Sequence, residues 1–220
     1  MSTKVKSFIG VALSQALAQT KAVYSVSLGA ESSRIVATAS GYQWAVDHFA
    51  EVNVFLGDGQ LLETTLIVTG VNQRLAPEIA RSIASETSRS LGEVSPVRQV
   101  TAASAIHGSE EFLMSMDCIN TAFENNPSFR ASLKRDANAY IDRLAKTSRL
   151  GVSYDVGIEL ATNYLKFEIA GYLLMARDGY LVDVYATGSG ELPTLKEFID
   201  GTLHGIPELA RRSCIIVKTE

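Results

Sequence analysis

The sequence predicts an α/β protein with a mostly parallel, Rossmann-like sheet flanked by helices. Short apolar segments rich in β-branched and aromatic residues alternate along the chain with longer segments whose apolar residues recur at helical spacing. This alternation is typical of parallel sheets, because the helix that links two parallel strands also covers a face of the sheet. The sequence of 220 residues shows no repeat, low-complexity tract or linker, so we expect one domain over 1–220.

Strands are expected where apolar residues alternate or run together over a few positions. These segments are 22–28, 52–56, 97–100, 180–186 and 213–218. Helices are expected where apolar residues return every third or fourth position. These segments are 34–49, 76–91, 110–124, 127–144, 156–175 and 195–203. In such sheets ligands collect beyond the carboxyl ends of the strands, so the residues after the first strand are the first candidates for a site.

Composition and charge argue against several classes of protein. The sequence is 46% hydrophobic and 20% charged, and no apolar run reaches the about 18 residues that cross a membrane. Two distant cysteines and no histidine–cysteine cluster give no reason to expect a disulfide framework, a metal site or another cofactor. A net charge of −4 argues against a generally basic RNA-binding surface, so any RNA contact must use local patches. We expect a soluble, cytoplasmic protein.

The first candidate site is Ser27, in a turn of small residues and hydroxyls between the first strand and the next helix. Two interpretations are open: Ser27 is a nucleophile, or the serines of this turn cap the helix. The hydrolase motif Gly-x-Ser-x-Gly fits less well, because Ser25 stands at its first glycine. No acidic residue is marked as the partner that a Ser–His–Asp triad needs.

Two further pairs place polar groups in segments that are otherwise apolar. Tyr164 and Glu168 lie one helical turn apart and share a face, where a phenol and a carboxylate together suit an ammonium group. Asp183 and Tyr185 are two apart in a predicted strand and point to the same side. Alternatively, Glu168 lies in water on an amphipathic helix, and the strand is an edge whose polar side chains are solvated.

In this order, the features resemble the tRNA-dependent cyclodipeptide synthases. That family has a catalytic serine in a turn after the first strand, then a Tyr-x-x-x-Glu helix, then a strand tyrosine. Ser27, Tyr164, Glu168 and Tyr185 fall on those positions, and the similarity spans roughly residues 20–190.

The sequence departs from the family pattern at three places. The family's first motif glycine is Ser25 here, its frequent asparagine is Ala30, and the strand tyrosine is followed by Ala186. The chain therefore resembles a divergent member.

The resemblance implies a fold similar to the catalytic domain of class I tyrosyl- and tryptophanyl-tRNA synthetases. It also implies a reaction in which two aminoacyl-tRNAs give a cyclic dipeptide (2,5-diketopiperazine). Ser27 would carry the first aminoacyl group as an acyl-enzyme, and Tyr164 and Glu168 would hold its α-ammonium. Glu168 and Tyr185 would transfer protons or position carbonyls. No ATP is needed, because the aminoacyl ester is already activated.

The resemblance further implies a pocket for the first aminoacyl side chain. The residues on its positions are Val23, Ser25, Val54, Val100, Gly171 and Asp183. A buried carboxylate needs a cation, and Gly171 would leave room for a long side chain. We therefore expect arginyl-tRNA as the first substrate, its guanidinium paired with Asp183 as in the arginine-containing branch described from fungi. Alternatively, Asp183 pairs internally with Arg177 or Lys166.

Contacts with tRNA are expected from Arg74, Arg81 and Arg89, which recur on the predicted helix 76–91 and its approach. The alternative is that they are solvated arginines of an exposed face. Two other functions are open. A serine esterase would use Ser27 with His107 or His204 as its base, and a binding module for tRNA or small molecules would lack catalysis.

Overall fold

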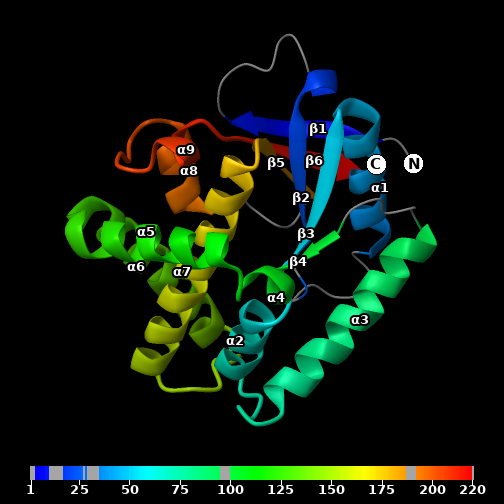
Figure 1. The fold of residues 1–220 in the computed structure, drawn as a ribbon. Helices are drawn as coiled ribbons and strands as arrows, with labels where there is room; N and C mark the ends of the chain where they lie inside the picture. The colour runs from blue at the N-terminus through cyan, green and yellow to red at the C-terminus, as the bar shows by residue number, and fades with distance from the viewer. Residues whose placement is uncertain are drawn as a thin grey trace.

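The computed structural model of the chain describes residues 3–9, 17–26, 28, 35–94, 100–186 and 192–219. Within these residues the strands form one sheet in the order β1-β6-β5-β2-β3-β4 (Figure 1). The strands are β1 (Thr3–Ile9), β2 (Lys21–Val26), β3 (Glu51–Leu56), β4 (Val100–Ala102), β5 (Tyr180–Ala186) and β6 (Ser213–Thr219). Neighbouring strands run parallel except β1, which is antiparallel to β6. The predicted mostly parallel sheet is confirmed.

Helices cover both faces of the sheet (Figure 1). They are α1 (Ile35–His48), α2 (Gln60–Val68), α3 (Ala76–Val94), α4 (Ala103–Ile106), α5 (Glu110–Asn125), α6 (Pro127–Lys146), α7 (Tyr154–Arg177), α8 (Pro193–Ile199) and α9 (Pro207–Ala210), with a short 3₁₀ helix, η1 (Leu17–Gln19), before β2. The long predicted helices are all present, with ends shifted by a few residues. Such shifts are expected because helix ends fray and are set by local caps.

The boundary between α5 and α6 shows how single residues set the helix ends. The Ser109 hydroxyl accepts the Phe112 N–H at 3.1 Å at the start of α5. The Asn126 side chain accepts the Phe129 N–H at 3.1 Å at the start of α6. Pro127 follows in the first turn of α6, where its missing N–H has no helical partner to lose. These caps set the boundary between the two helices that the sequence predicted.

The sequence did not predict β1, α2, α4 and α9. The two short helices have only four residues each, and α2 is a nine-residue apolar helix that periodicity does not distinguish from a buried strand. β1 is a short segment near the N-terminus, and it forms the antiparallel edge of the sheet. The strand predicted at 97–100 is present from Val100 as β4, and 95–99 lie outside the described residues.

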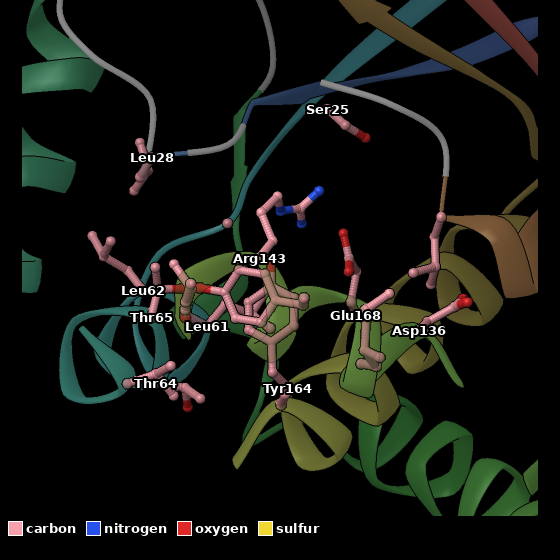
Figure 2. Close-up of a pocket in the computed structure, with 18 of the residues that line it drawn as sticks. Ser25, Leu28, Leu61, Leu62, Thr64, Thr65, Asp136, Arg143, Tyr164 and Glu168 are labelled. Atoms are coloured by element: carbon pink, nitrogen blue, oxygen red, sulfur yellow. The ribbon is translucent and has the colours of Figure 1, made fainter. Parts of the chain in front are cut away.

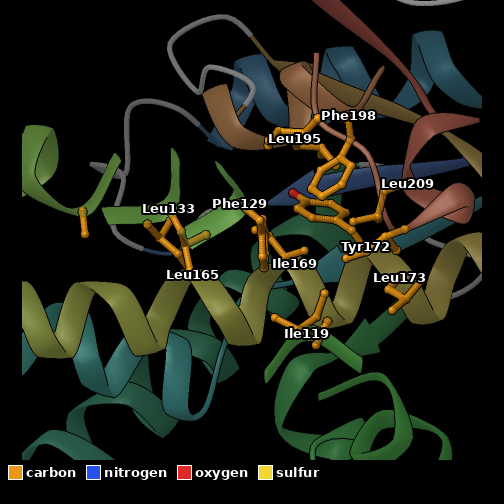
Figure 3. Packing of buried hydrophobic residues seen from close by; sticks show 14 of the residues in the cluster. Ile119, Phe129, Leu133, Leu165, Ile169, Tyr172, Leu173, Leu195, Phe198 and Leu209 are labelled. Atoms are coloured by element: carbon orange, nitrogen blue, oxygen red, sulfur yellow. The ribbon is translucent and has the colours of Figure 1, made fainter. Parts of the chain in front are cut away.

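The strands present alternate residues to two different apolar layers. One layer packs the sheet against α1, with Tyr24 and Val184 among its buried residues. The other packs it against α7, which is covered in turn by α5, α6, α8 and α9 (Figure 3). From Ile169 to Ala176 every residue of α7 is buried. The carboxyl end of this helix is therefore core, and Tyr172 is the residue of this stretch that also lines the cavity described below.

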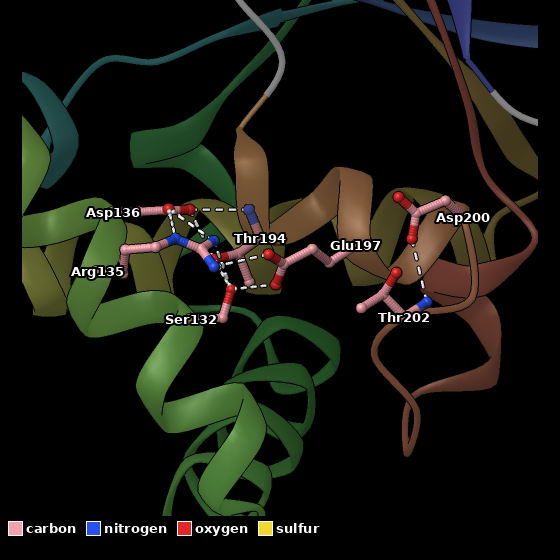
Figure 4. Close-up of polar contacts among 7 residues, drawn as sticks. All are labelled: Ser132, Arg135, Asp136, Thr194, Glu197, Asp200 and Thr202. Carbon is pink, nitrogen blue, oxygen red and sulfur yellow. Dashed lines mark hydrogen bonds and ion pairs between the residues drawn. The ribbon is translucent and has the colours of Figure 1, made fainter.

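A polar cluster fixes α8 against α6 (Figure 4). One oxygen of the Asp136 carboxylate accepts both the N–H of Thr194, at 2.8 Å, and its hydroxyl, at 2.6 Å. The other accepts the Arg135 guanidinium, which also pairs with Glu197 at 2.7 Å. Asp136 therefore satisfies the first turn of α8, and its charge is balanced by Arg135.

A wholly buried ion pair joins β5 to the residue before β6. Both side chains of Arg212 and Asp183 are 0% exposed, and the guanidinium contacts both carboxylate oxygens, with Nε 2.8 Å from one of them. The remaining nitrogen donates to the backbone carbonyls of Tyr172, at 2.8 Å, and Tyr180, at 3.0 Å. Because all of these groups lie out of water, each needs the other to offset its loss of hydration.

Asp183→Asn is expected to lower the free energy of unfolding by about 3–5 kcal/mol, because it leaves the Arg212 charge buried without a counter-charge. Urea unfolding followed by circular dichroism measures this. Asp117→Asn removes an exposed carboxylate on α5 and should change the same quantity by no more than about 0.5 kcal/mol. Equal stability of the two variants would contradict the role given to the pair.

Candidate functional site

A cavity of 790 Å³ opens at the carboxyl ends of β2 and β3 (Figure 2). Ser25 and Val26 of β2 and Phe55 of β3 form its inner end, and α2, α6 and α7 supply its walls. This is the edge of the sheet where a ligand is expected to bind.

Three residues of α7 line the cavity one helical turn apart: Tyr164, Glu168 and Tyr172. The predicted shared face of Tyr164 and Glu168 is confirmed. Tyr172 is not among the residues predicted from the sequence, although it continues the same spacing of four residues that joins the other two.

Glu168 is a half-buried carboxylate, and none of the described residues forms a hydrogen bond or ion pair with it. Burial, together with the negative charge of Asp183, raises its pKa to about 7. The charge of Glu168, together with burial, raises the pKa of Tyr164 well above its usual value. Glu168 therefore does not stand in open water as the alternative interpretation held. At neutral pH it can gain or lose a proton, while Tyr164 keeps its hydroxyl hydrogen.

Tyr185 of β5 also lines the cavity and belongs to a chain of hydroxyl groups. Its hydroxyl donates to that of Tyr172 at 2.6 Å, and the Tyr172 hydroxyl donates to Ser25 Oγ at 3.3 Å. Burial raises the pKa of both tyrosines well above the usual value, so both stay neutral. β5 lies between β6 and β2, so the alternative of a solvated edge strand is wrong.

Ser27, the predicted nucleophile, lies outside the described residues. Val26 and Leu28, its neighbours in sequence, both line the cavity. The assignment of Ser27 as the nucleophile stays a prediction.

Of the residues predicted to line a pocket for the first side chain, Ser25 lines this cavity and the others do not. Val23 is covered by the packing of the sheet on α7, and Val54 faces the α1 layer because it alternates with Phe55. Val100 is 42% exposed on the edge strand β4. The space over Gly171 is filled by the Phe55 ring, 3.1 Å from where a Cβ would stand. The expectation that Gly171 leaves room for a substrate is therefore corrected.

The expected role of Asp183 is also corrected. Its carboxylate is occupied by Arg212 and is 0% exposed, so it presents no free charge to a substrate guanidinium. The alternative of an internal pair was right in kind but named the wrong partners. Arg177 contacts Ser115 instead, at 3.2 Å, and the Lys166 ammonium lies over the Phe123 ring, 3.9 Å from its centre.

The arginines that could contact a ligand on an exposed helix or in the cavity form two groups. Arg74, Arg81 and Arg89 are exposed on α3 and its approach, so both interpretations given for them stand. Arg143 and Arg149 line the cavity, as do Thr65 of α2 and Thr69, the residue that caps α2. We call these four residues the outer wall. Figure 2 shows the Arg143 guanidinium pointing into the cavity.

Two glycines lie where α2 and the α6–α7 loop come into contact, next to the outer wall. Gly70 follows α2 with a φ of 96°, and Gly151 lies in the loop between α6 and α7. A Cβ on Gly151 would stand 2.1 Å from the Gly70 Cα, and the Gly151 N–H donates to the Val68 carbonyl at 2.9 Å. Backbone therefore meets backbone where α2 approaches the α6–α7 loop.

No histidine lines the cavity among the described residues. His107 lies against the rings of Phe112 and Phe167, and His204 is exposed. A serine esterase of the kind considered above would therefore lack its base at this site.

The parts of the chain that the structure describes hold no group of three or more metal-ligating side chains. None of the described helices is long and apolar enough to cross a membrane.

The sequence matches no protein-family model, and no curated protein is significantly similar to it. Solved structures do share its fold. A cyclodipeptide synthase (CDPS) from Fluoribacter dumoffii has a TM-score of 0.76 at 16% identity, covering 100% of both chains. A cyclo(L-leucyl-L-phenylalanyl) synthase has a TM-score of 0.73 at 15% identity, covering 100% of this chain and 99% of its own.

A third structure, from Mycobacterium tuberculosis, has a TM-score of 0.67 at 17% identity, covering 93% of this chain and 87% of its own. It is described as demonstrating that cyclodipeptide synthetases are related to type I tRNA synthetases. The likeness agrees with the expectation of a fold similar to those synthetases. This chain has the fold of the cyclodipeptide synthases.

Proposed function

We propose that this protein is an aminoacyltransferase that makes a cyclic dipeptide from two aminoacyl-tRNAs. The observation that carries the proposal is Glu168, a carboxylate without a partner among the described residues, one turn from Tyr164 in a cavity at the carboxyl ends of the strands. This arrangement suits the α-ammonium of an aminoacyl ester, which brings one positive charge and several N–H donors. The fold shared with cyclodipeptide synthases supports the same function.

In the first step, the Ser27 hydroxyl attacks the ester carbonyl of the first aminoacyl-tRNA. The terminal hydroxyl of the tRNA leaves and takes the proton, and the aminoacyl group becomes an ester of Ser27. One ester replaces another of similar energy, so ATP is not required. The absence of histidine from the described cavity wall is compatible with this chemistry.

In the second step, the amine of the second aminoacyl group attacks the acyl-enzyme carbonyl, and a peptide bond forms as Ser27 is released. The amine of the first residue then attacks the remaining ester, which closes the ring and frees the second tRNA. Each amine must lose a proton before it attacks. Glu168 suits this task because its pKa of about 7 lies close to the roughly 7.7–8.0 of an α-amino group. Tyr185 donates its one hydrogen to Tyr172 at 2.6 Å, so its expected role toward the carbonyl groups would be exerted through the Tyr172 hydroxyl.

Arginyl-tRNA as the first substrate remains a prediction of the sequence alone. Its original support was Asp183, which in the structure binds Arg212. The cavity is still large enough for a long side chain, at 790 Å³. Incubation with single aminoacyl-tRNAs, arginyl-tRNA among them, identifies the first substrate directly.

The protein incubated with a mixture of charged tRNAs is expected to release cyclic dipeptides, identified by mass spectrometry. Ser27→Ala should release none, and intact-mass measurement should find no acyl-enzyme with it. Ser128→Ala is the matched control, since it removes an exposed serine hydroxyl from the first turn of α6, away from the cavity. It should accumulate an acyl-enzyme at the wild-type rate, and digestion should place the aminoacyl group on Ser27.

Acyl transfer that persists in Ser27→Ala would reject the assigned nucleophile. A wild-type protein that binds charged tRNA without product would favour the non-catalytic binding module. Hydrolysis of the ester that requires His107 or His204 would favour the esterase.

The rate of dipeptide formation is expected to fall about tenfold per pH unit below pH 7 and to level off above it. The reason is that Glu168 acts as a carboxylate, and its pKa of about 7 sets the pH at which that form is lost. Single-turnover rates between pH 5.5 and 8.5 measure this. Glu168→Gln should be slow at every pH, and a profile with no break near pH 7 would contradict the role.

The same pKa predicts an effect on stability. A carboxyl group raised above its usual 4.5 stabilises the folded state in its protonated form, and that contribution is lost as pH rises through about 7. Glu168→Gln resembles the protonated acid, so it should be more stable than wild type at pH 8 and equal to it near pH 4.5. Glu159→Gln, at an exposed position on the same helix, is the control and should show no such divergence.

Replacing Arg74, Arg81 and Arg89 with alanine is expected to raise KM for aminoacyl-tRNA several-fold with little change in kcat, because phosphate contacts bind without taking part in the chemistry. The slope of log KM against log salt concentration should fall by about one for each arginine that binds a phosphate. Arg211→Ala, which removes an exposed arginine beside α9, is the control. No change in KM or salt dependence would leave the three arginines as solvated surface.

A further inference from the structure

We infer that Tyr172 is a positioning residue, and that Ser25, which it orients, donates a hydrogen bond to the carbonyl oxygen of the aminoacyl group under attack. The inference rests on the proposed function and adds two residues to it. Neither belongs to the serine, Tyr-x-x-x-Glu and strand-tyrosine pattern discussed above.

The hydrogen bonds among the three hydroxyl groups have a direction. A phenol carries one hydrogen, and Tyr185 donates its own to the oxygen of Tyr172. Tyr172 donates its hydrogen in turn to Ser25 Oγ. Ser25 therefore already accepts one bond, and no described residue accepts the hydrogen that its own hydroxyl carries. Since Ser25 lines the cavity, that hydrogen is available to a bound ligand.

Both phenols keep their hydrogens over the working pH range, because burial raises the pKa of Tyr172 and of Tyr185 well above the usual value. The direction of donation is that of the geometry. Each donated bond also polarises the next hydroxyl, which makes Ser25 a better donor than an isolated serine.

The Tyr172 ring is held from two sides. The Arg212 guanidinium carbon lies 5.1 Å from the ring centre, and the same side chain donates to the Tyr172 carbonyl at 2.8 Å. The Phe55 ring lies 6.3 Å away at 50°, and it can pack there because Gly171 has no side chain. The Tyr172 ring is thus positioned by Arg212, which does not line the cavity, and by Phe55, which does.

The ligand group that suits this donor is a carbonyl oxygen. When a nucleophile adds to an ester, the carbonyl oxygen gains negative charge, and a donor already in place stabilises that charge more than it stabilises the uncharged ester. An ammonium group would leave the hydrogen of Ser25 without an acceptor, because an ammonium brings only donors. Glu168 lines the same cavity and suits the ammonium, so the two ends of an aminoacyl ester find different partners.

The family resembled by this sequence has glycine at the position of Ser25, so the hydroxyl chain is a property of this chain's own residues. Serine in place of that glycine puts a side-chain donor at the carboxyl end of β2. Ser27, the proposed nucleophile, comes two residues later in the sequence.

The test is a double-mutant cycle on the rate of acyl-enzyme formation, measured in single turnovers with the full-length protein and a charged tRNA that the wild type uses. Tyr172→Phe is expected to slow the step about tenfold at saturating tRNA, with KM changed less than twofold, since one neutral hydrogen bond is lost from a polarised chain. Ser25→Ala is expected to slow it about 10-fold to 100-fold. The double variant should be no more than about twofold slower than Ser25→Ala, because Tyr172 acts through Ser25.

Tyr154→Phe is the matched control. It removes a tyrosine hydroxyl that bonds Asp142 at 2.6 Å outside the cavity, and the acylation rate should not change. Thermal unfolding is recorded for every variant. If Tyr172→Phe fails to fold, Tyr185→Phe tests the chain from its other end, and it too should slow acylation less in the Ser25→Ala background than in wild type.

Full additivity of the two substitutions, or an unchanged rate in Tyr172→Phe, would overturn the inference while leaving the proposed function intact. A wild-type protein that forms no acyl-enzyme with any charged tRNA would instead reject the proposed function, and the inference with it.

Discussion

The buried pair of Arg212 and Asp183 is the interaction on which the arrangement of the site depends. It joins β5 to the later part of α7 through the Tyr172 carbonyl, and both side chains of the pair are fully buried. That end of α7 carries Tyr172, and one and two turns earlier the same helix carries Glu168 and Tyr164. The spacing of these three residues follows from the helix itself, but their place over the sheet depends on where this ion pair fixes the helix.

Much of the fold could be predicted from the sequence because its long elements have strong periodicity. α5, α6 and α7 repeat apolar residues over many turns, and the parallel strands are short apolar runs. The edge strand β1 and the short helix α2 could not, because a few residues do not define a period. Tertiary contacts stabilise them instead: β1 pairs with β6, and α2 packs on α3 and α7.

Within the candidate site, the sequence predicted those residues whose relation depends on spacing within one helix or strand. Tyr164 and Glu168 were found because one helical turn joins them, and the same rule extended by one turn would have found Tyr172. The partner of Asp183 could not be found in this way. Arg212 is 29 residues further along and adjoins Arg211, which is exposed. The sequence does not indicate which of the two arginines is buried. Without a partner from the chain for Asp183, a substrate arginine was the expected cation.

The meeting of Gly70 and Gly151 bears on how the shape of the cavity could change by mutation. Pockets usually acquire new specificity by exchanging one side chain for a smaller or larger one. Between α2 and the α6–α7 loop the closest approach is between two main chains, at Gly70 and Gly151. Neither glycine has a side chain to exchange for a smaller one, so point substitutions at this pair cannot move the two segments apart. A different separation would require insertions or deletions there, whereas the wall itself can change through the side chains of Thr65, Thr69, Arg143 and Arg149.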